Sequence, residues 1–182
     1  TNLQEAELFV NGRSAGKRIP EEYTVTWQVP YEKGEIKVVA TDERWGVYER
    51  SRHSFGSSHE IKLCCEKTQL RADGEDIAAV VIFTVDENGV PVDNARDRVN
   101  VTVSGARLIG FDNGDSTDYD SYKSPCRKLF SGKATALIAA ADESGDITVR
   151  AEAPGLKPAE LKLAAVPAEV RHGASFGYSI SA

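Results

Sequence analysis

The chain has 182 residues, a length that suits one large domain or two small ones. Hydrophobic residues make up 41% and charged residues 27%, with 15 glycines and 7 prolines, so disorder, collagen and a membrane-spanning protein are excluded. The formal net charge of −6 argues against nucleic acid and anionic membranes as partners. Methionine is absent and no basic or apolar leader opens the chain, which is therefore expected to be a piece of a longer protein.

The first sixty residues show the alternation typical of short β-strands. The pair Asn11-Gly12 follows an apolar run and predicts a hairpin turn, because both central positions of a type I′ turn need positive φ. Trp27 lies in an alternating segment and is expected in the core. Strands are predicted at 7–10, 23–29, 35–40 and within 47–55.

A change in composition at 56–59 opens a second series of strands. Its alanine-rich segment 134–141 is predicted as strand because it lacks a capped stripe of 3.6-residue period. Strands are predicted at 60–65, 76–85, 99–103, 133–140, 146–153 and, as a last edge, 161–163.

The predicted fold class is all-β, with two immunoglobulin-like antiparallel β-sandwich domains. The first domain is placed at 1–60 and the second at 61–166, followed by a tail at 167–182. An immunoglobulin-like sandwich typically needs about 100 residues, so the first domain is expected to be incomplete at its N-terminus.

The three cysteines do not suit a disulfide scaffold or a zinc site. Cys64 and Cys65 are adjacent, so in a strand they point to opposite faces, and Cys126 lies far along the chain. Cys126 could pair with either of them. Buried free thiols are the preferred alternative.

Several segments of the first unit resemble a known family. They are Glu7-Leu8-Phe9-Val10-Asn11-Gly12-Arg13-Ser14-Ala15-Gly16, Trp27-Gln28-Val29-Pro30-Tyr31 and Gly34-Glu35-Ile36-Lys37-Val38-Val39-Ala40. They look like the small β-sandwich domain that follows the catalytic barrel in glycoside hydrolase family 2 enzymes of the β-galactosidase type. In the second unit, segments 70–78, 86–92, 109–115, 129–134 and 145–148 resemble the last immunoglobulin-like domain of that family, which is itself similar to invasin-type repeats.

The resemblance implies an accessory role. The chemistry of such enzymes needs two glutamates on a (β/α)₈ barrel, and no segment here alternates strand and helix as that barrel would. No catalytic residue is therefore assigned. The implied role is packing on the catalytic domain of a bacterial parent, or support of its oligomerisation, with a periplasmic or secreted location favoured over the cytoplasm.

An acidic segment at 112–120 is a candidate metal site. Carboxylate oxygens are the ligands that Ca²⁺ prefers, but the spacing of an EF-hand is not met. A solvated turn, in which these side chains hold backbone amides, is the preferred alternative. Ser116 stands where the family usually has proline. The candidate ligands are Asp112, Asp115, Asp118 and Asp120.

Three aromatic residues are candidates for stacking on a sugar. Trp45 is expected at an exposed hairpin tip, and Tyr119 and Tyr122 lie in the acidic segment. A carbohydrate-binding module is thus the first alternative function, and an adhesin-type repeat the second. Packing of Trp45 against a neighbouring domain would explain its exposure equally well.

The tail carries one further expectation. Residues 174–180 alternate, with Phe176, Tyr178 and Ile180 on one face. We predict that this segment forms a strand against an exposed sheet edge of its own chain or of a second copy, and that the chain dimerises through such edges.

Overall fold

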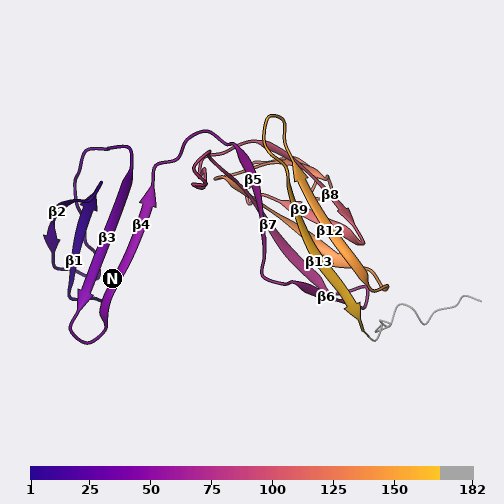
Figure 1. The fold of residues 1–182 in the computed structure, drawn as a ribbon, viewed down its shortest axis with the longest axis horizontal. Coiled ribbons are helices and arrows are strands. Elements are labelled where there is room, and N and C mark those ends of the chain that lie inside the picture. The colour runs from indigo at the N-terminus through magenta and orange to yellow at the C-terminus, as the bar shows by residue number, and fades with distance from the viewer. Residues whose placement is uncertain (169–182) are drawn as a thin grey trace, which may run out of the picture. The chain divides into compact units, whose positions relative to one another are not determined.

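The computed structural model describes residues 1–168, and strands are the only regular elements in that range (Figure 1). The all-β prediction is confirmed, and no helix in the described range is long and apolar enough to cross a membrane. The chain divides into two compact units, Thr1–Ser54 and a second unit from Phe55 onward. The division falls ahead of the expected boundary at residue 60.

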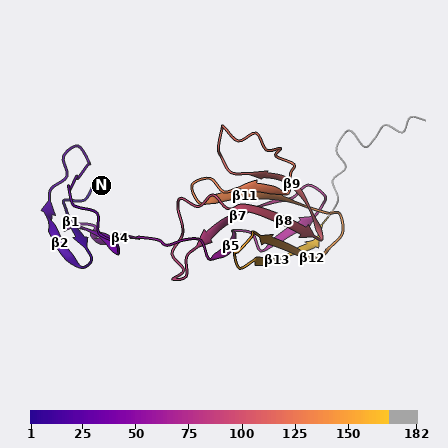
Figure 2. The ribbon, with the colours of Figure 1, turned by 90° about the horizontal axis from the view of Figure 1, so that it is seen from above.

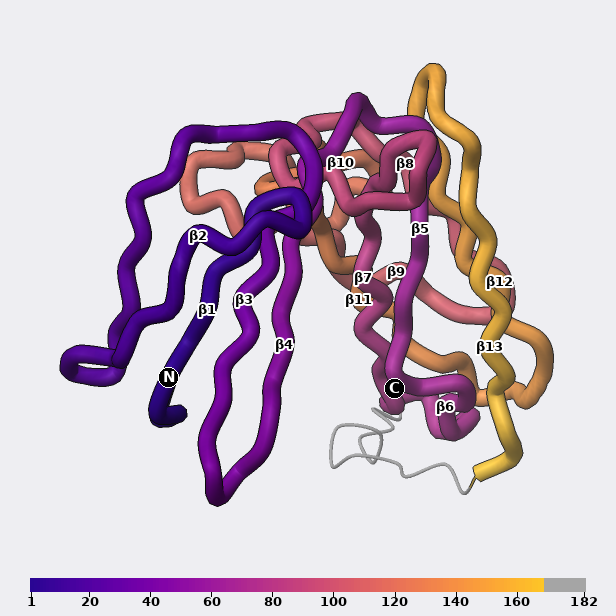
Figure 3. The backbone as a smooth tube through the Cα atoms, turned by 60° about the vertical axis from the view of Figure 1, so that its left-hand side comes forward, coloured from indigo at the N-terminus to yellow at the C-terminus, as the bar shows by residue number. Residues whose placement is uncertain are grey.

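The first unit is built on one antiparallel sheet of order β2-β1-β3-β4, which can be followed in Figure 3. Asn11 and Gly12 have φ of 49° and 77°, so the predicted hairpin turn is confirmed. Residues 1–54 supply this single sheet, where the sequence predicted an incomplete sandwich. Its strands are β1 (Glu5–Val10), β2 (Arg13–Arg18), β3 (Glu35–Asp42) and β4 (Gly46–His53).

The predicted strand at 23–29 is wrong. Glu22 and Tyr23 adopt φ of 49° and 65°, which turns the chain sharply, and a single bridge from Glu21 to Thr24 is the only strand-like pairing there. Trp27 is half-buried rather than part of the core, and its indole N–H donates a 3.0 Å hydrogen bond to the carbonyl of Gly16. The alternation in this segment therefore reflects packing beside β2.

The second unit is a two-layered β-sandwich (Figure 2). One sheet has the order β10-β8-β12-β13-β6 and the other β5-β7-β11-β9. The alanine-rich strand is confirmed as β11. The strands are β5 (Glu60–Cys65), β6 (Gln69–Ala72), β7 (Ile77–Val85), β8 (Arg98–Ser104), β9 (Ala106–Asp112), β10 (Cys126–Lys128), β11 (Lys133–Ala140), β12 (Gly145–Glu152) and β13 (Ala159–Pro167).

The strand predicted at 161–163 is present, but its predicted place at the edge of a sheet is wrong. It is part of β13, which lies inside its sheet with β12 on one side and β6 on the other. The pairing with β6 is parallel, with Ala164 opposite Gln69, whereas we expected antiparallel pairing throughout. Parallel pairing joins segments far apart in sequence, so no local turn signal announces it.

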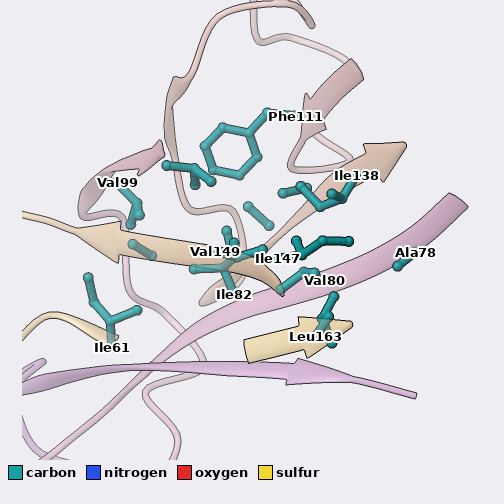
Figure 4. Close-up of a cluster of buried hydrophobic side chains, with 14 of the residues drawn as sticks. Ile61, Ala78, Val80, Ile82, Val99, Phe111, Ile138, Ile147, Val149 and Leu163 are labelled. Atoms are coloured by element: carbon teal, nitrogen blue, oxygen red, sulfur yellow. The ribbon is translucent and has the colours of Figure 1, made fainter. Parts of the chain in front are cut away.

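The core of the second unit lies between its two sheets (Figure 4). Alternate residues of each strand point inward, as in β7, where Val80 and Ile82 are fully buried and Ile77 is exposed. Phe111 at the end of β9 is also fully buried. Each such side chain contributes about 1.5–3 kcal/mol through burial, so this layer holds the sandwich together.

All three cysteines are free thiols. Cys64 is exposed and Cys65 and Cys126 are partly exposed, so the expectation that the thiols are buried is wrong. The two adjacent cysteines do point to opposite sides of β5, and Cys126 begins β10 in the other sheet. The predicted strand at 174–180 and the dimer contact built on it lie outside the described residues.

Candidate functional site

The acidic segment forms a loop between β9 and β10 that is organised around a buried arginine. Arg127 follows Cys126 in β10, and its side chain is 1% exposed. Its guanidinium donates to the carboxylate of Asp118 at 3.0 Å and to the backbone carbonyl of Asp120 at 2.6 Å. Asp112 lies 3.8 Å away. One buried cation therefore holds the loop at Asp118 and Asp120.

Further hydrogen bonds complete this loop. Asn113 Nδ2 donates to Asp118 at 2.8 Å and to the carbonyl of Lys128 at 3.0 Å. The N–H of Asp120 and the amide of Asn113, with the charge of Arg127, lower the pKa of Asp118. Arg98 holds the Asp120 carboxylate at 2.7 Å. Hydrogen bonds and ion pairs therefore fix the conformation of the loop at Asn113, Asp118 and Asp120.

Each of the four candidate metal ligands already has a partner, and Asp112 and Asp118 share Arg127. Asp118 and Asp120 bind arginines, while Asp115 accepts hydrogen bonds from the hydroxyl and N–H of Thr117, which lower its pKa. Within residues 1–168, no group of three or more His, Cys, Asp or Glu side chains is placed to hold a metal ion. The side chains of the loop accept hydrogen bonds from nearby backbone N–H groups, as the alternative of capped turns expects, and the calcium site stays a prediction.

The two tyrosines of the loop are presented differently. Tyr119 is 99% exposed. Tyr122 is 63% exposed, and the guanidinium of Arg127 lies 5.0 Å from the centroid of its ring. A cation on one face of Tyr122 leaves the other face for a ligand. The structure thus leaves the sugar-binding expectation for both residues untested.

Trp45 lies in the tight turn between β3 and β4, as expected. The carboxylate of Asp42 accepts hydrogen bonds from the N–H groups of Arg44 and Trp45 at 2.8 and 3.0 Å, which fixes the turn. The guanidinium of Arg44 lies 5.0 Å from the indole centroid. Trp45 is 57% exposed and, with Asn2, Leu3 and Tyr48, lines a hollow of about 260 Å³. Tyr48 was not among the residues expected from the sequence, where it is marked only as an aromatic residue in a strand.

The carboxyl groups before β7 belong to a structural turn. The N–H groups of Glu75 and Asp76 donate to Asp73 and lower its pKa. Lys67 and the N–H of Arg71 lower the pKa of Asp76 to about 2. Because a glycosidase acid must hold its proton near neutral pH, neither group can serve as that acid.

Comparison with known proteins agrees with these observations. The protein-family model described as glycoside hydrolase family 2 C-terminal domain 5 matches residues 61–162, more than half of the chain. The chain belongs to this family. A second model, for a domain of unknown function, matches residues 1–45.

Relatives of this family 2 C-terminal region are longer enzymes. The chain is 35% identical over 164 residues to the β-galactosidase BoGH2A of Bacteroides ovatus, a match that covers 88% of this chain and 19% of that protein. It is 24% identical over 180 residues to a β-glucuronidase of Formosa agariphila, covering 95% of this chain and 18% of that protein. The chain spans about a fifth of the length of these relatives.

Solved structures give the same result. A β-glycosidase from Bacteroides vulgatus superimposes with a TM-score of 0.86 and 29% identity, covering 90% of this chain and 21% of that one. A family 2 glycosyl hydrolase from Bacteroides cellulosilyticus gives 0.84 and 27%, covering 92% and 22%. The resemblance seen in the sequence is therefore confirmed. The family 2 C-terminal region matches a small, non-catalytic part of these bacterial enzymes.

Proposed function

We propose that this chain is the accessory region of a family 2 glycoside hydrolase of the β-galactosidase type, and that it packs against the catalytic part of the same polypeptide. The observation that supports the proposal is the asymmetry of the matches. Nearly the whole chain aligns with relatives of which it covers only about a fifth. The remaining four fifths leave ample length for a catalytic barrel.

The side chains support the same proposal. The carboxyl groups of Asp73, Asp76, Asp115 and Asp118 all have lowered pKa values and are engaged with backbone N–H groups. A retaining glycosidase needs two carboxyl groups about 5 Å apart, one of them with a raised pKa. These carboxylates instead stabilise turns, which suits a supporting role.

The test compares this chain with the full polypeptide. Nitrophenyl β-galactoside should be cleaved by the full polypeptide and not by residues 1–182 alone. Turnover by residues 1–182 that disappears on a single Glu→Gln change would overturn the accessory assignment. Cleavage of nitrophenyl β-glucuronide alone by the full polypeptide would reassign the substrate class and leave the accessory role in place.

The location of the parent, periplasmic or secreted, is part of the same proposal. Its support is the bacterial origin of the relatives. Fractionation of cells that express the full polypeptide tests it, since activity retained in the cytoplasmic fraction would contradict it.

A further inference from the structure

The sheet of the first unit has two faces of different character. On one face, which we call the paired face, the charged side chains of neighbouring strands satisfy each other. Lys17 binds Glu5 at 2.7 Å, and the hydroxyl of Ser14 donates to Glu7 at 2.6 Å. The remaining contacts on this face join Lys37 to Glu49, His53 to Glu35, and the Lys37 ammonium to the ring of Phe9.

The opposite face carries an apolar centre with arginines beside it, and we call it the arginine face. Residues directly opposite in paired strands share a face, so the register assigns it. Ala6, Leu8 and Val10 of β1 lie opposite Ala40, Val38 and Ile36 of β3. These in turn lie opposite Tyr48, Arg50 and Arg52 of β4.

The arginine face is only partly covered within the first unit. Leu8 and Ala6 are buried, but Ile36 is 42% exposed and Tyr48 is 54% exposed. A sheet normally covers its apolar face with a second layer, and exposed apolar area of this kind usually marks an interaction site. The uncovered part of the face lies toward β4, which forms the edge of the sheet.

Two arginines of β4 on this side, Arg50 and Arg52, have no carboxylate partner within the first unit, whereas Arg13 of β2, opposite Val10, is paired with Glu32. Arg50 and Arg52 are exposed, and each donates only to the carbonyl of the preceding residue, at 3.4 Å. The same sheet pairs its charges on the other face, so a shortage of acidic residues does not explain this. Unpaired guanidinium groups beside an apolar centre suit carboxylates on an opposing surface.

The composition of the face favours a protein surface as the occupant. Tyrosine, tryptophan and arginine are the residues enriched at the centres of protein interfaces, and here Tyr48 adjoins Trp45 in the 260 Å³ hollow. A second copy of this face is a poor occupant, because its own arginines would repel Arg50 and Arg52. The relatives are about five times longer than this chain, so a large part of the same polypeptide is available to cover it.

We propose that the arginine face binds a carboxylate-bearing surface on the remaining part of the same polypeptide, with Tyr48 as the apolar anchor and Arg50 and Arg52 as the ion-pairing groups. The inference rests on the proposed packing function. It adds to that function the surface and the chemistry of the contact.

Hydroxyl-radical footprinting can test this surface. Residues 1–182 and the full polypeptide are oxidised in parallel, and the rates at Tyr48 and Ile36 are compared with the rate at Val47. Val47 is the internal control, because it is 64% exposed and lies on the paired face next to Tyr48. In the full polypeptide the rates at Tyr48 and Ile36 should fall several-fold, while the rate at Val47 should change little.

The outcomes separate the inference from the function on which it rests. Protection of other surfaces without protection of Tyr48 and Ile36 would overturn the inference and leave the packing function in place. Equal oxidation of every residue in the two proteins would overturn both. Protection that appears in residues 1–182 on addition of galactose or a galactan would identify a sugar site instead and overturn the inference.

Charge reversal gives an independent measurement. The variant Arg50→Glu/Arg52→Glu should restore oxidation of Tyr48 in the full polypeptide and leave the melting temperature of residues 1–182 nearly unchanged. The matched control is Lys133→Glu/Lys162→Glu, which changes the charge equally at exposed lysines without ion pairs among the described residues. Retained protection of Tyr48 in the arginine variant would contradict the role of the arginines.

Discussion

Replacement of Arg127 by methionine should destabilise the second unit strongly. Removing one partner of a buried ion pair typically costs about 3–5 kcal/mol, because the other charge is left buried. Here Asp118 is 14% exposed and keeps the N–H of Asp120 and the amide of Asn113 as donors, so the cost falls at the low end of that range. We expect a loss of about 3 kcal/mol, and hence about 10 °C in melting temperature for a unit of this size.

The position of the tryptophans makes the measurement specific. Trp27 and Trp45, the only two in the chain, both lie in the first unit. Tryptophan fluorescence therefore follows the unfolding of that unit, while far-ultraviolet circular dichroism follows both. Arg127→Met should shift a dichroism transition and leave the fluorescence transition in place.

Arg98→Met is the control for this prediction. Arg98 also binds an aspartate of the loop, but its side chain is 45% exposed, and exposed ion pairs are worth about 1 kcal/mol or less. If Arg127→Met lowered the melting temperature no more than Arg98→Met does, the argument that a buried cation organises the loop would be refuted.

Trp45→Ala should change the free energy of unfolding of residues 1–182 by no more than about 0.5 kcal/mol, so the melting temperature should hardly move. Titration with galactan should show no saturable binding to either form. Saturable binding that is lost in the variant would support a carbohydrate-binding module. Asp76→Asn should lower stability at neutral pH. Because folding lowers the pKa of Asp76 to about 2, the difference from the unchanged chain should shrink as the pH falls from about 4 toward 2 in urea unfolding; a difference at pH 2 as large as that at neutral pH would contradict the assignment. Gly105→Ala should lower the free energy of unfolding by at least about 2 kcal/mol, because a Cβ there would lie 2.1 Å from the carbonyl oxygen of Asp146. Gly114→Ala is the control, since Gly114 has a similar φ and open space around it, and should cost about 1 kcal/mol. Equal losses in urea unfolding would show that backbone conformation alone matters at Gly105.

Local patterns predicted the parts of the fold that depend on local interactions. The Asn11-Gly12 turn and the long apolar strand β7 are confirmed because positive φ and two-residue alternation are written in adjacent residues. The segment at 23–29 misled the prediction, since its alternation is real but Glu22 and Tyr23 turn the chain with positive φ that their side chains do not announce. The pairing of β6 with β13 escaped for a different reason, since its partners are far apart in sequence.

In the candidate site, too, local features could be predicted from the sequence and features that depend on distant residues could not. The capped turns of the acidic loop were the preferred reading of its sequence, because aspartate and asparagine hold nearby backbone amides. The burial of Arg127 could not be predicted, since an arginine beside Lys128 in a polar segment is normally predicted to be exposed. The arginine face was also missed, because the contrast between paired and unpaired charges appears only when the strand register is known.

The place of β13 within its sheet has a consequence for synthesis on the ribosome. β12 and β6 both depend on β13 for a neighbour, and β13 ends at Pro167. Until that strand has left the exit tunnel, β6 has no partner in its sheet, and one side of β12 presents free N–H and carbonyl groups. The second unit therefore completes its fold only when nearly all of the described chain has been made, and a nascent chain stalled before Ala159 would expose two strand edges to chaperones or to aggregation.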